Sequence, residues 1–198
     1  MPAKEYGLKR KLVEDEECYQ FYERYALTEE HVSPMAIPGN KDGLYVADGL
    51  EHTPTGIPSS SASDHQQQLK KREEKLTAFY YGDEWAEILK SQDTSTAIVL
   101  TWGSVYTNVK EAVLDLNTQG YAIDLIAVRL LMPLQSKAIE ALCQHKKVLV
   151  VEQSYSGQFY HYCLGRGAIE SKASSLAKPG PLVLKTDEIQ AFIKEVLR

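Results

Sequence analysis

Reactive side chains stand at two turns that each follow a short apolar run. Gly103-Ser104 comes after residues 97–101, and Glu152 comes directly after residues 148–151. A small-residue turn before a helix can present free N–H groups to a phosphate, and a carboxylate at a strand end can act as a general base. Gly103-Ser104 can also be a plain tight turn, and Glu152 can contact a partner or accept bonds from the turn that follows. We favour these plainer interpretations, because neither G-x-G-x-x-G nor a P-loop lysine is present.

Two acid–histidine pairs lie in the first half of the chain, at Glu51-His52 and Asp64-His65. Carboxylates and imidazoles bind Zn²⁺, but this spacing matches none of the tetrahedral signatures. No G-x-S-x-G pattern is present, and no cysteine is set up as a nucleophile. From its residues alone, the chain is predicted to lack a self-contained active site and a metal site.

The elements that position the two turns are short apolar runs alternating with amphipathic helical patterns. Strands are predicted at residues 97–101, 122–128, 147–151 and 181–184, and helices at 108–116, 135–144, a short segment ending near 164, and 187–197. A βαβαβ order indicates a parallel sheet covered by helices. The predicted fold is therefore α/β, with three α/β/α layers and a mostly parallel sheet of about five strands.

The first 63 residues follow a different pattern. The acidic run Glu14 to Glu17 can open an N-terminal helix, because carboxylates favour a helix N-terminus. Prolines and glycines are then too frequent over residues 31–63 for a helix of normal length. Apolar residues between these breakers predict an extended arm packed against another part, the end of a preceding domain.

A polar linker helix is expected to follow the arm. Asp64 offers an N-cap, the charged run Lys70 to Lys75 lies within the helix, and Gly82 ends it. The sequence thus divides into the N-terminal helix and arm at 1–63, the linker helix at 64–92 and the α/β domain at 93–198.

Composition excludes some partners. The net charge of −5 gives no global attraction to nucleic acid or to anionic membranes, and no apolar run approaches membrane-spanning length. The three cysteines, Cys18, Cys143 and Cys163, are odd in number and lack C-x-x-C spacing. Cys143 is expected to be a small buried thiol. An odd number of cysteines without paired spacing suits the reducing cytoplasm, which is the predicted location.

Three blocks of residues carry a family resemblance. They are Arg24-Tyr25-Ala-Leu-Thr28 with Val32-Ser33-Pro34-Met35-Ala36-Ile37-Pro38-Gly39; Gly49-Leu-Glu51-His52 with Gly56, Asp64 and Lys71-Arg72-Glu-Glu-Lys75-Leu76; and Trp102-Gly103-Ser104 with Pro133, Val150-Val-Glu152-Gln153 and Gly157-Gln158. In this order the blocks resemble the C-terminal part of the α subunit of 2-oxoacid:ferredoxin oxidoreductases, most closely the 2-oxoglutarate type. The α/β domain resembles the transketolase C-terminal domain.

The resemblance implies an enzyme that uses thiamine diphosphate and Mg²⁺ to decarboxylate a 2-oxoacid oxidatively. It forms an acyl-CoA and passes electrons to ferredoxin through iron–sulfur clusters. The implied partners are the remaining α-subunit domains, the β subunit and, through the complex, ferredoxin, in a hetero-oligomer, with a homodimer also open. The chain alone is expected to bind no cofactor and to be inactive, because no catalytic residue can be carried over. Its role would be assembly and scaffolding.

The matched positions are therefore candidates for structure or for contacts between parts. They are Glu51, His52, Lys71, Arg72, Lys75, Gly103, Ser104, Glu152, Gly157 and Gln158. The chain departs from the family at Met35, where Gly-Ile-Ser-Pro-Arg commonly ends in arginine, and at Ser154, where asparagine is frequent.

Two alternatives remain open. The first is a stand-alone ligand-binding module that uses the strand ends near Ser104 and Glu152. The second is a fragment of a transketolase or of a 2-oxoacid dehydrogenase β chain, against which the Gly49-Leu-Glu51-His52 block argues.

Overall fold

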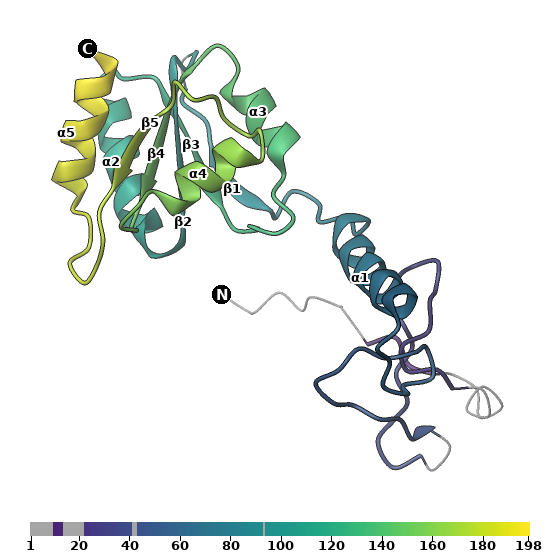
Figure 1. Ribbon diagram of the computed structural model, residues 1–198. Helices are drawn as coiled ribbons and strands as arrows, with labels where there is room; N and C mark the ends of the chain where they lie inside the picture. The colour runs from purple at the N-terminus through teal and green to yellow at the C-terminus, as the bar shows by residue number, and fades with distance from the viewer. Residues whose placement is uncertain (1–9, 14–21, 41–42, 93) are drawn as a thin grey trace. The chain divides into compact units, whose positions relative to one another are not determined.

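The computed structural model describes residues 10–13, 22–40, 43–92 and 94–198 (Figure 1). The chain forms two compact units, Met1–Tyr80 and Tyr81–Arg198. The predicted N-terminal helix falls mainly on residues 14–21, which lie outside the described residues, and residues 22–25 are not helical. No helix within the described ranges combines the length and apolarity needed to cross a membrane.

The second unit contains a five-stranded sheet with the order β1-β3-β2-β4-β5. The strands are β1 (Ala86–Leu89), β2 (Ala97–Trp102), β3 (Ile123–Val128), β4 (Lys147–Glu152) and β5 (Ser174–Ala177). The pairs β2–β3, β2–β4 and β4–β5 are parallel, and β1 runs antiparallel to β3 at one edge. The predicted mostly parallel α/β sheet is confirmed.

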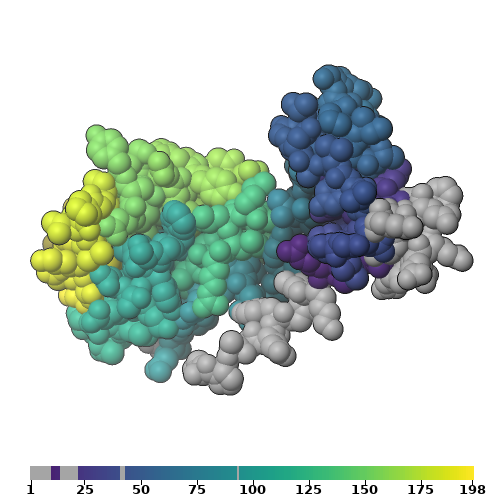
Figure 2. All heavy atoms as spheres, turned by 90° about the horizontal axis from the view of Figure 1, so that it is seen from below, coloured from purple at the N-terminus to yellow at the C-terminus, as the bar shows by residue number. Residues whose placement is uncertain are grey.

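Helices cover both faces of this sheet (Figure 1). On one face lie α2 (Tyr106–Thr118) and α5 (Thr186–Leu197), side by side in Figures 1 and 2. On the other face lie α3 (Ser136–Cys143) and α4 (Gln158–Gly165). Alternate residues of β2 supply the two cores, because successive strand side chains point to opposite faces. Val99 packs with α2 and α5, whereas Ile98 and Leu100 pack with α3 and α4.

Two edge strands differ from the prediction. The segment 181–184 is not a strand, although Leu184 is buried in the core beneath α2 and α5. The fifth strand is instead β5, whose Ser-Ser-Leu-Ala sequence has little apolar character because the edge of the sheet is only partly buried. The antiparallel strand β1 was not predicted, since its four residues include the charged Glu87.

The N-cap of the linker helix also differs from the prediction. The linker helix α1 is Ala62–Thr77, and its N-cap is Ser61 rather than Asp64. Asp64 lies in the first turn instead, where it accepts a 2.5 Å bond from the Ser59 hydroxyl. In α5 the N-cap is Lys185, whose N–H donates to the Glu188 carboxylate at 2.9 Å.

The first unit has little apolar core. Within its described residues, only Val13 and Ala36 form a buried hydrophobic pair, with Tyr22 packed against them. Helix α1 buries Gln68, whose amide donates to the Tyr25 carbonyl at 3.1 Å, while Leu69 is exposed. The arm also exposes apolar side chains, namely Leu44, Tyr45, Val46, Leu50 and Ile57. Polar contacts therefore hold this unit together.

A buried carboxylate, Asp124, secures the amino-terminal end of the sheet. It accepts bonds from the Ser91 N–H at 2.9 Å, the Ser95 hydroxyl at 2.8 Å and the Lys146 ammonium at 2.8 Å. Burial would raise the pKa of Asp124, but these bonds outweigh it and lower the pKa to about 2. The network ties the loop after β1 to β3 and β4.

We predict that Asp124→Asn lowers the free energy of unfolding of the second unit by about 3 kcal/mol, because Lys146 loses its buried partner. Urea unfolding followed by tryptophan fluorescence measures this, since both tryptophans, Trp85 and Trp102, lie in the second unit. The exposed Asp115→Asn is the control, with an expected change of under about 0.5 kcal/mol. Equal effects of the two variants would contradict the role of the network.

The lowered pKa of Asp124 predicts that the stability of the second unit depends on pH. The pKa of this carboxylate is lower in the folded state, at about 2, than in the unfolded chain, so its contribution is fully present above about pH 4 and is lost as pH falls through 2. The stability difference between the wild type and Asp124→Asn should shrink by about 2 kcal/mol between pH 6 and pH 2. A difference that stays constant over this range would refute this assignment.

Candidate functional site

The carboxyl ends of β2 and β4 meet at the position where α/β sheets of this type bind ligands. The connection after β2 leads toward β3 on one side, and the connection after β4 leads toward β5 on the other. Such a reversal opens a crevice between the two strand ends. Ser104 follows β2 and Glu152 ends β4, so the structure brings these two candidates to the same edge.

Glu152 is completely buried, and its bonding capacity is used within the chain. One carboxylate oxygen accepts the Ser154 hydroxyl at 2.7 Å and the Phe159 N–H at 2.9 Å. The other accepts the Tyr160 N–H at 2.9 Å. Glu152 thus caps the N-terminus of α4, where the helix dipole favours a negative charge. This geometry is the plainer interpretation of Glu152, in which the carboxylate accepts bonds from the turn that follows.

Ser154 completes this cap. Its hydroxyl oxygen accepts the N–H groups of Gly157 at 3.0 Å and Gln158 at 3.2 Å. Gly157 adopts a left-handed φ of 66°, and a Cβ there would lie 3.7 Å from a Glu152 oxygen. The N–H groups of residues 157–160 are all bonded inside the chain, so none is left for a phosphate.

The turn after β2 borders a shallow hollow of about 370 Å³ between the ends of β2 and β3. Gly103 has a left-handed φ of 70°, and Ser104 is exposed. The charges in the hollow are paired: Glu87 accepts from the Lys110 ammonium at 2.8 Å and from the Arg129 guanidinium at 2.6 Å. These contacts lower the pKa of Glu87, so the hollow offers no basic group for proton abstraction.

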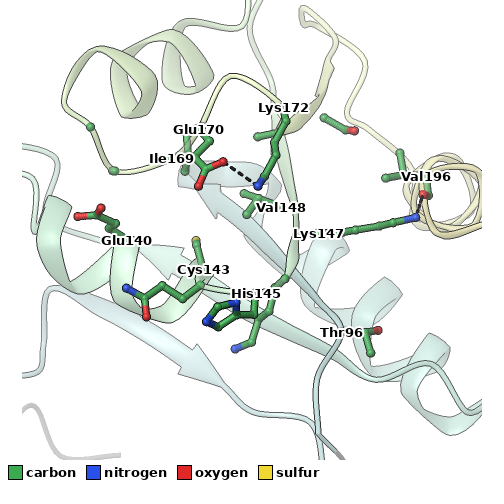
Figure 3. Close-up of a pocket in the computed structure, with 16 residues that line it drawn as sticks. Thr96, Glu140, Cys143, His145, Lys147, Val148, Ile169, Glu170, Lys172 and Val196 are labelled. Atoms are coloured by element: carbon green, nitrogen blue, oxygen red, sulfur yellow. Dashed lines mark hydrogen bonds and ion pairs between the residues drawn. The ribbon is translucent and has the colours of Figure 1, made fainter.

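A larger hollow of about 900 Å³ lies at the opposite edge, around the amino end of β4 (Figure 3). Lys172 pairs there with Glu170 at 2.7 Å, and the Lys147 ammonium donates to the Val196 carbonyl at 3.0 Å. Burial raises the pKa of Cys143 to about 11, so this lining thiol is not a nucleophile. No sequence motif indicates this hollow, because separate segments of the chain line it.

The first unit brings together several of the charged candidate residues of the arm and α1. The Arg72 guanidinium donates to both oxygens of Glu51, at 3.2 and 2.8 Å, and His65 lies 3.0 Å from the same carboxylate. Arg72 is the main cause that lowers the pKa of Glu51 to about 2, against the effect of burial. This bidentate ion pair fastens the arm to α1.

The other candidates in this unit have different neighbours. His52 stacks on Tyr25 with ring centroids 4.5 Å apart, and its Nε2 lies 3.2 Å from Asp48 without forming a hydrogen bond. The Lys71 ammonium donates to the Ser33 hydroxyl. Of the two acid–histidine pairs, Glu51 and His65 therefore lie within bonding distance, but no group of three potential metal ligands occurs among the described residues.

Comparison with known proteins gives the chain its relatives. No family model matches it. The α subunit of 2-oxoacid:ferredoxin oxidoreductase 2 from Aeropyrum pernix is 27% identical over 179 residues, which are 89% of this chain and 27% of that subunit. The α subunit of the 2-oxoacid:ferredoxin oxidoreductase from Saccharolobus solfataricus is 26% identical over 178 residues, which are 88% of this chain and 28% of the subunit.

A solved structure agrees with these relatives. The 2-oxoglutarate:ferredoxin oxidoreductase from Magnetococcus marinus, with 2-oxoglutarate, coenzyme A and succinyl-CoA bound, matches 96% of this chain with a TM-score of 0.79 and 29% identity. The chain is similar to part of these oxidoreductases. It spans about a quarter of the length of the related α subunits and 33% of the Magnetococcus chain. A transketolase from Campylobacter jejuni aligns with 58% of the chain at a TM-score of 0.43 and 21% identity.

Met35, one of the departures from the oxidoreductase pattern, lies beside an arginine from another part of the chain. Met35 stands where the family commonly has arginine, and its sulfur lies 3.3 Å from an Arg10 guanidinium nitrogen. The Arg10 guanidinium therefore lies beside this turn.

We predict that Glu152→Ala lowers the free energy of unfolding of the second unit by about 3 kcal/mol, because buried N–H groups at the start of α4 lose their acceptor. Urea unfolding followed by tryptophan fluorescence measures the effect. Glu170→Ala removes an exposed carboxylate and should cost under about 0.5 kcal/mol. If Glu152→Ala were as stable as this control, Glu152 would not be the cap.

We predict that Glu51→Gln loosens the arm, because the amide cannot hold the Arg72 guanidinium as the carboxylate does. Native-state digestion with thermolysin should cut the variant several-fold faster within residues 43–60, where apolar side chains are exposed. Glu73→Gln, on the exposed side of α1, is the matched control. Unchanged cleavage in Glu51→Gln would show that the ion pair does not hold the arm.

Proposed function

We propose that this chain is the non-catalytic C-terminal part of the α subunit of a 2-oxoacid:ferredoxin oxidoreductase, serving subunit assembly and scaffolding. The observation that carries this proposal is the match of 96% of the chain to one third of the Magnetococcus enzyme at a TM-score of 0.79. The curated relatives add support, because 88–89% of the chain aligns with α subunits of this enzyme class. The reaction, substrate and partners belong to the proposal.

The carboxylates near the strand ends are already bonded within the chain, which supports a scaffolding role. Glu152 is committed to capping α4, and Glu87 is committed to two cations. Neither carboxylate can then take a proton from a substrate without giving up its partners. The exposed apolar side chains of the arm, among them Leu44 and Leu50, support contact with another part of the enzyme.

We further propose 2-oxoglutarate as the substrate of the complete enzyme, since the Magnetococcus enzyme carries 2-oxoglutarate, coenzyme A and succinyl-CoA. We propose thiamine diphosphate, Mg²⁺ and iron–sulfur clusters as cofactors of the complete enzyme, because the family resemblance implies them. The residues of this chain do not fit a cluster, because it has three cysteines and a cluster usually takes four. Cys163 is also buried and Cys143 partly buried, and burial raises the pKa of both thiols. Other parts of the complex would hold these groups.

The proposed partners are the remaining α-subunit domains and the β subunit, with ferredoxin reached through the complex. A second copy of the α subunit is a further candidate partner. The cytoplasm is the proposed location, because an odd number of cysteines without a disulfide pattern suits a reducing compartment.

The competing hypothesis is a stand-alone ligand-binding module. It would need the crevice between Ser104 and Glu152, yet the Glu152 oxygens and the N–H groups of residues 157–160 are already bonded. Isothermal titration with coenzyme A, thiamine diphosphate and nucleotides separates the two hypotheses. Micromolar binding that is lost in Glu152→Ala, with folding retained, would favour the module.

We predict that the purified chain alone does not turn over 2-oxoglutarate with coenzyme A, thiamine diphosphate and ferredoxin. Adding the remaining α-subunit portion and the β subunit should produce turnover, because the cofactors would then be present. Reduction of ferredoxin, followed by absorbance, measures this. Turnover by the chain alone, or equal turnover by the other parts without it, would contradict the proposal.

A further inference from the structure

Three cations of the first unit have no acidic partner among the residues that the structure describes. Most other cations of this unit are paired, as Arg72 is with Glu51 and Lys70 with Glu74. Among the described residues, no carboxylate lies within ion-pair distance of Arg24, Lys71 or Lys75. An uncompensated group of cations is unusual in a chain whose net charge is −5.

Lys71 is the centre of this group. It is half-buried, and its ammonium donates to the Ser33 hydroxyl. The Ser33 hydroxyl itself donates to the Ala26 carbonyl at 2.9 Å, so its hydrogen is already used. An ammonium has three N–H donors, so the bond to Ser33 leaves two of them for another acceptor.

Arg24 supplies a guanidinium held by aromatic rings. Its central carbon lies 5.7 Å from the ring centroid of Tyr25 and 5.6 Å from that of Tyr45. A guanidinium stacked in this way keeps the N–H groups at its edge free for an anion. Tyr25 is in turn fixed by stacking on the buried His52, so the guanidinium rests on an ordered support.

Lys75 lies one helical turn after Lys71 on α1, which places the two side chains on the same side of the helix. Burial first, and then the charges of Arg24, Lys75 and Arg72, lower the pKa of Lys71 to about 8. The charges of Arg24, Lys75 and Arg72 therefore act on the Lys71 ammonium, and among the described residues Arg72 is the one of these four cations that pairs with a carboxylate.

We propose that Arg24, Lys71 and Lys75 form a binding site for a doubly charged tetrahedral oxyanion, the phosphate group of a small molecule. A dianion would accept the remaining N–H donors of Lys71 and the edge of the Arg24 guanidinium in charge-assisted bonds. It would also remove the repulsion among the cations. This site does not rest on the proposed function, and its test does not involve oxidoreductase activity.

The first test is isothermal titration of the full chain with sulfate, which mimics a phosphate dianion and keeps its charge across the pH range used. Sulfate should bind saturably at constant ionic strength, and the monoanion acetate should bind at least about tenfold more weakly. Lys71→Met should weaken sulfate binding roughly tenfold, as the loss of one charge-assisted bond implies. The neighbouring Lys70→Met, whose ammonium pairs with Glu74, should change it less than about twofold.

A second measurement separates the site from general attraction to positive charge. Affinity for sulfate should fall about tenfold between pH 7 and pH 9, because Lys71 loses its proton above a pKa of about 8. Lys71→Arg should bind sulfate without this fall, since a guanidinium stays charged. Circular dichroism shows that each variant is folded.

The proposal would be overturned by the absence of saturable sulfate binding, by equal weakening in Lys70→Met and Lys71→Met, or by the same pH dependence in Lys71→Arg as in the wild type. Sulfate binding that survives Arg24→Gln unchanged would remove Arg24 from the site and would overturn the arrangement described.

Discussion

The burial of β2 on both faces is the constraint on which the second unit depends. Residues Ala97 to Leu100 are completely excluded from water. A strand can be buried in this way only if other strands take its hydrogen bonds on both sides and helices cover both of its faces. The neighbours β3 and β4, the helix pair α2 and α5, and the helix pair α3 and α4 meet these demands.

The burial of β2 also determines what the carboxylate at the end of β4 can bond to. Parallel pairing brings the ends of β2 and β4 to one edge, but Glu152 is then enclosed beneath the start of α4. A buried carboxylate needs donors, and the nearest ones are the N–H groups of the helix it faces. The position that could have held a ligand therefore stabilises the fold. The first unit is the opposite case, because ion pairs and hydrogen bonds join its arm to α1 while apolar side chains remain exposed.

Much of the second unit was predictable, because its strands are continuous apolar runs and its helices have one apolar face. The errors lie at the sheet edges: β5 is too polar to recognise, and β1 contains Glu87. The contacts of the first unit could not be predicted in the same way. Glu51 meets Arg72 across 21 residues, and Lys71 meets Ser33 across 38, so no local spacing reports either pair. The family resemblance marked these residues without showing what they contact.

We propose that the second unit is complete in itself, whereas other parts of a larger oxidoreductase complete the arm. Hydrogen exchange on the isolated chain, and on the chain combined with the remaining α-subunit portion and the β subunit, tests it most directly. We expect slow exchange in β2, β3 and β4 in both samples. We also expect fast exchange in residues 43–60 of the isolated chain and clear protection of them in the complex. Arm amides that exchange as slowly as those of β2 in the isolated chain, or that gain no protection in the complex, would contradict it.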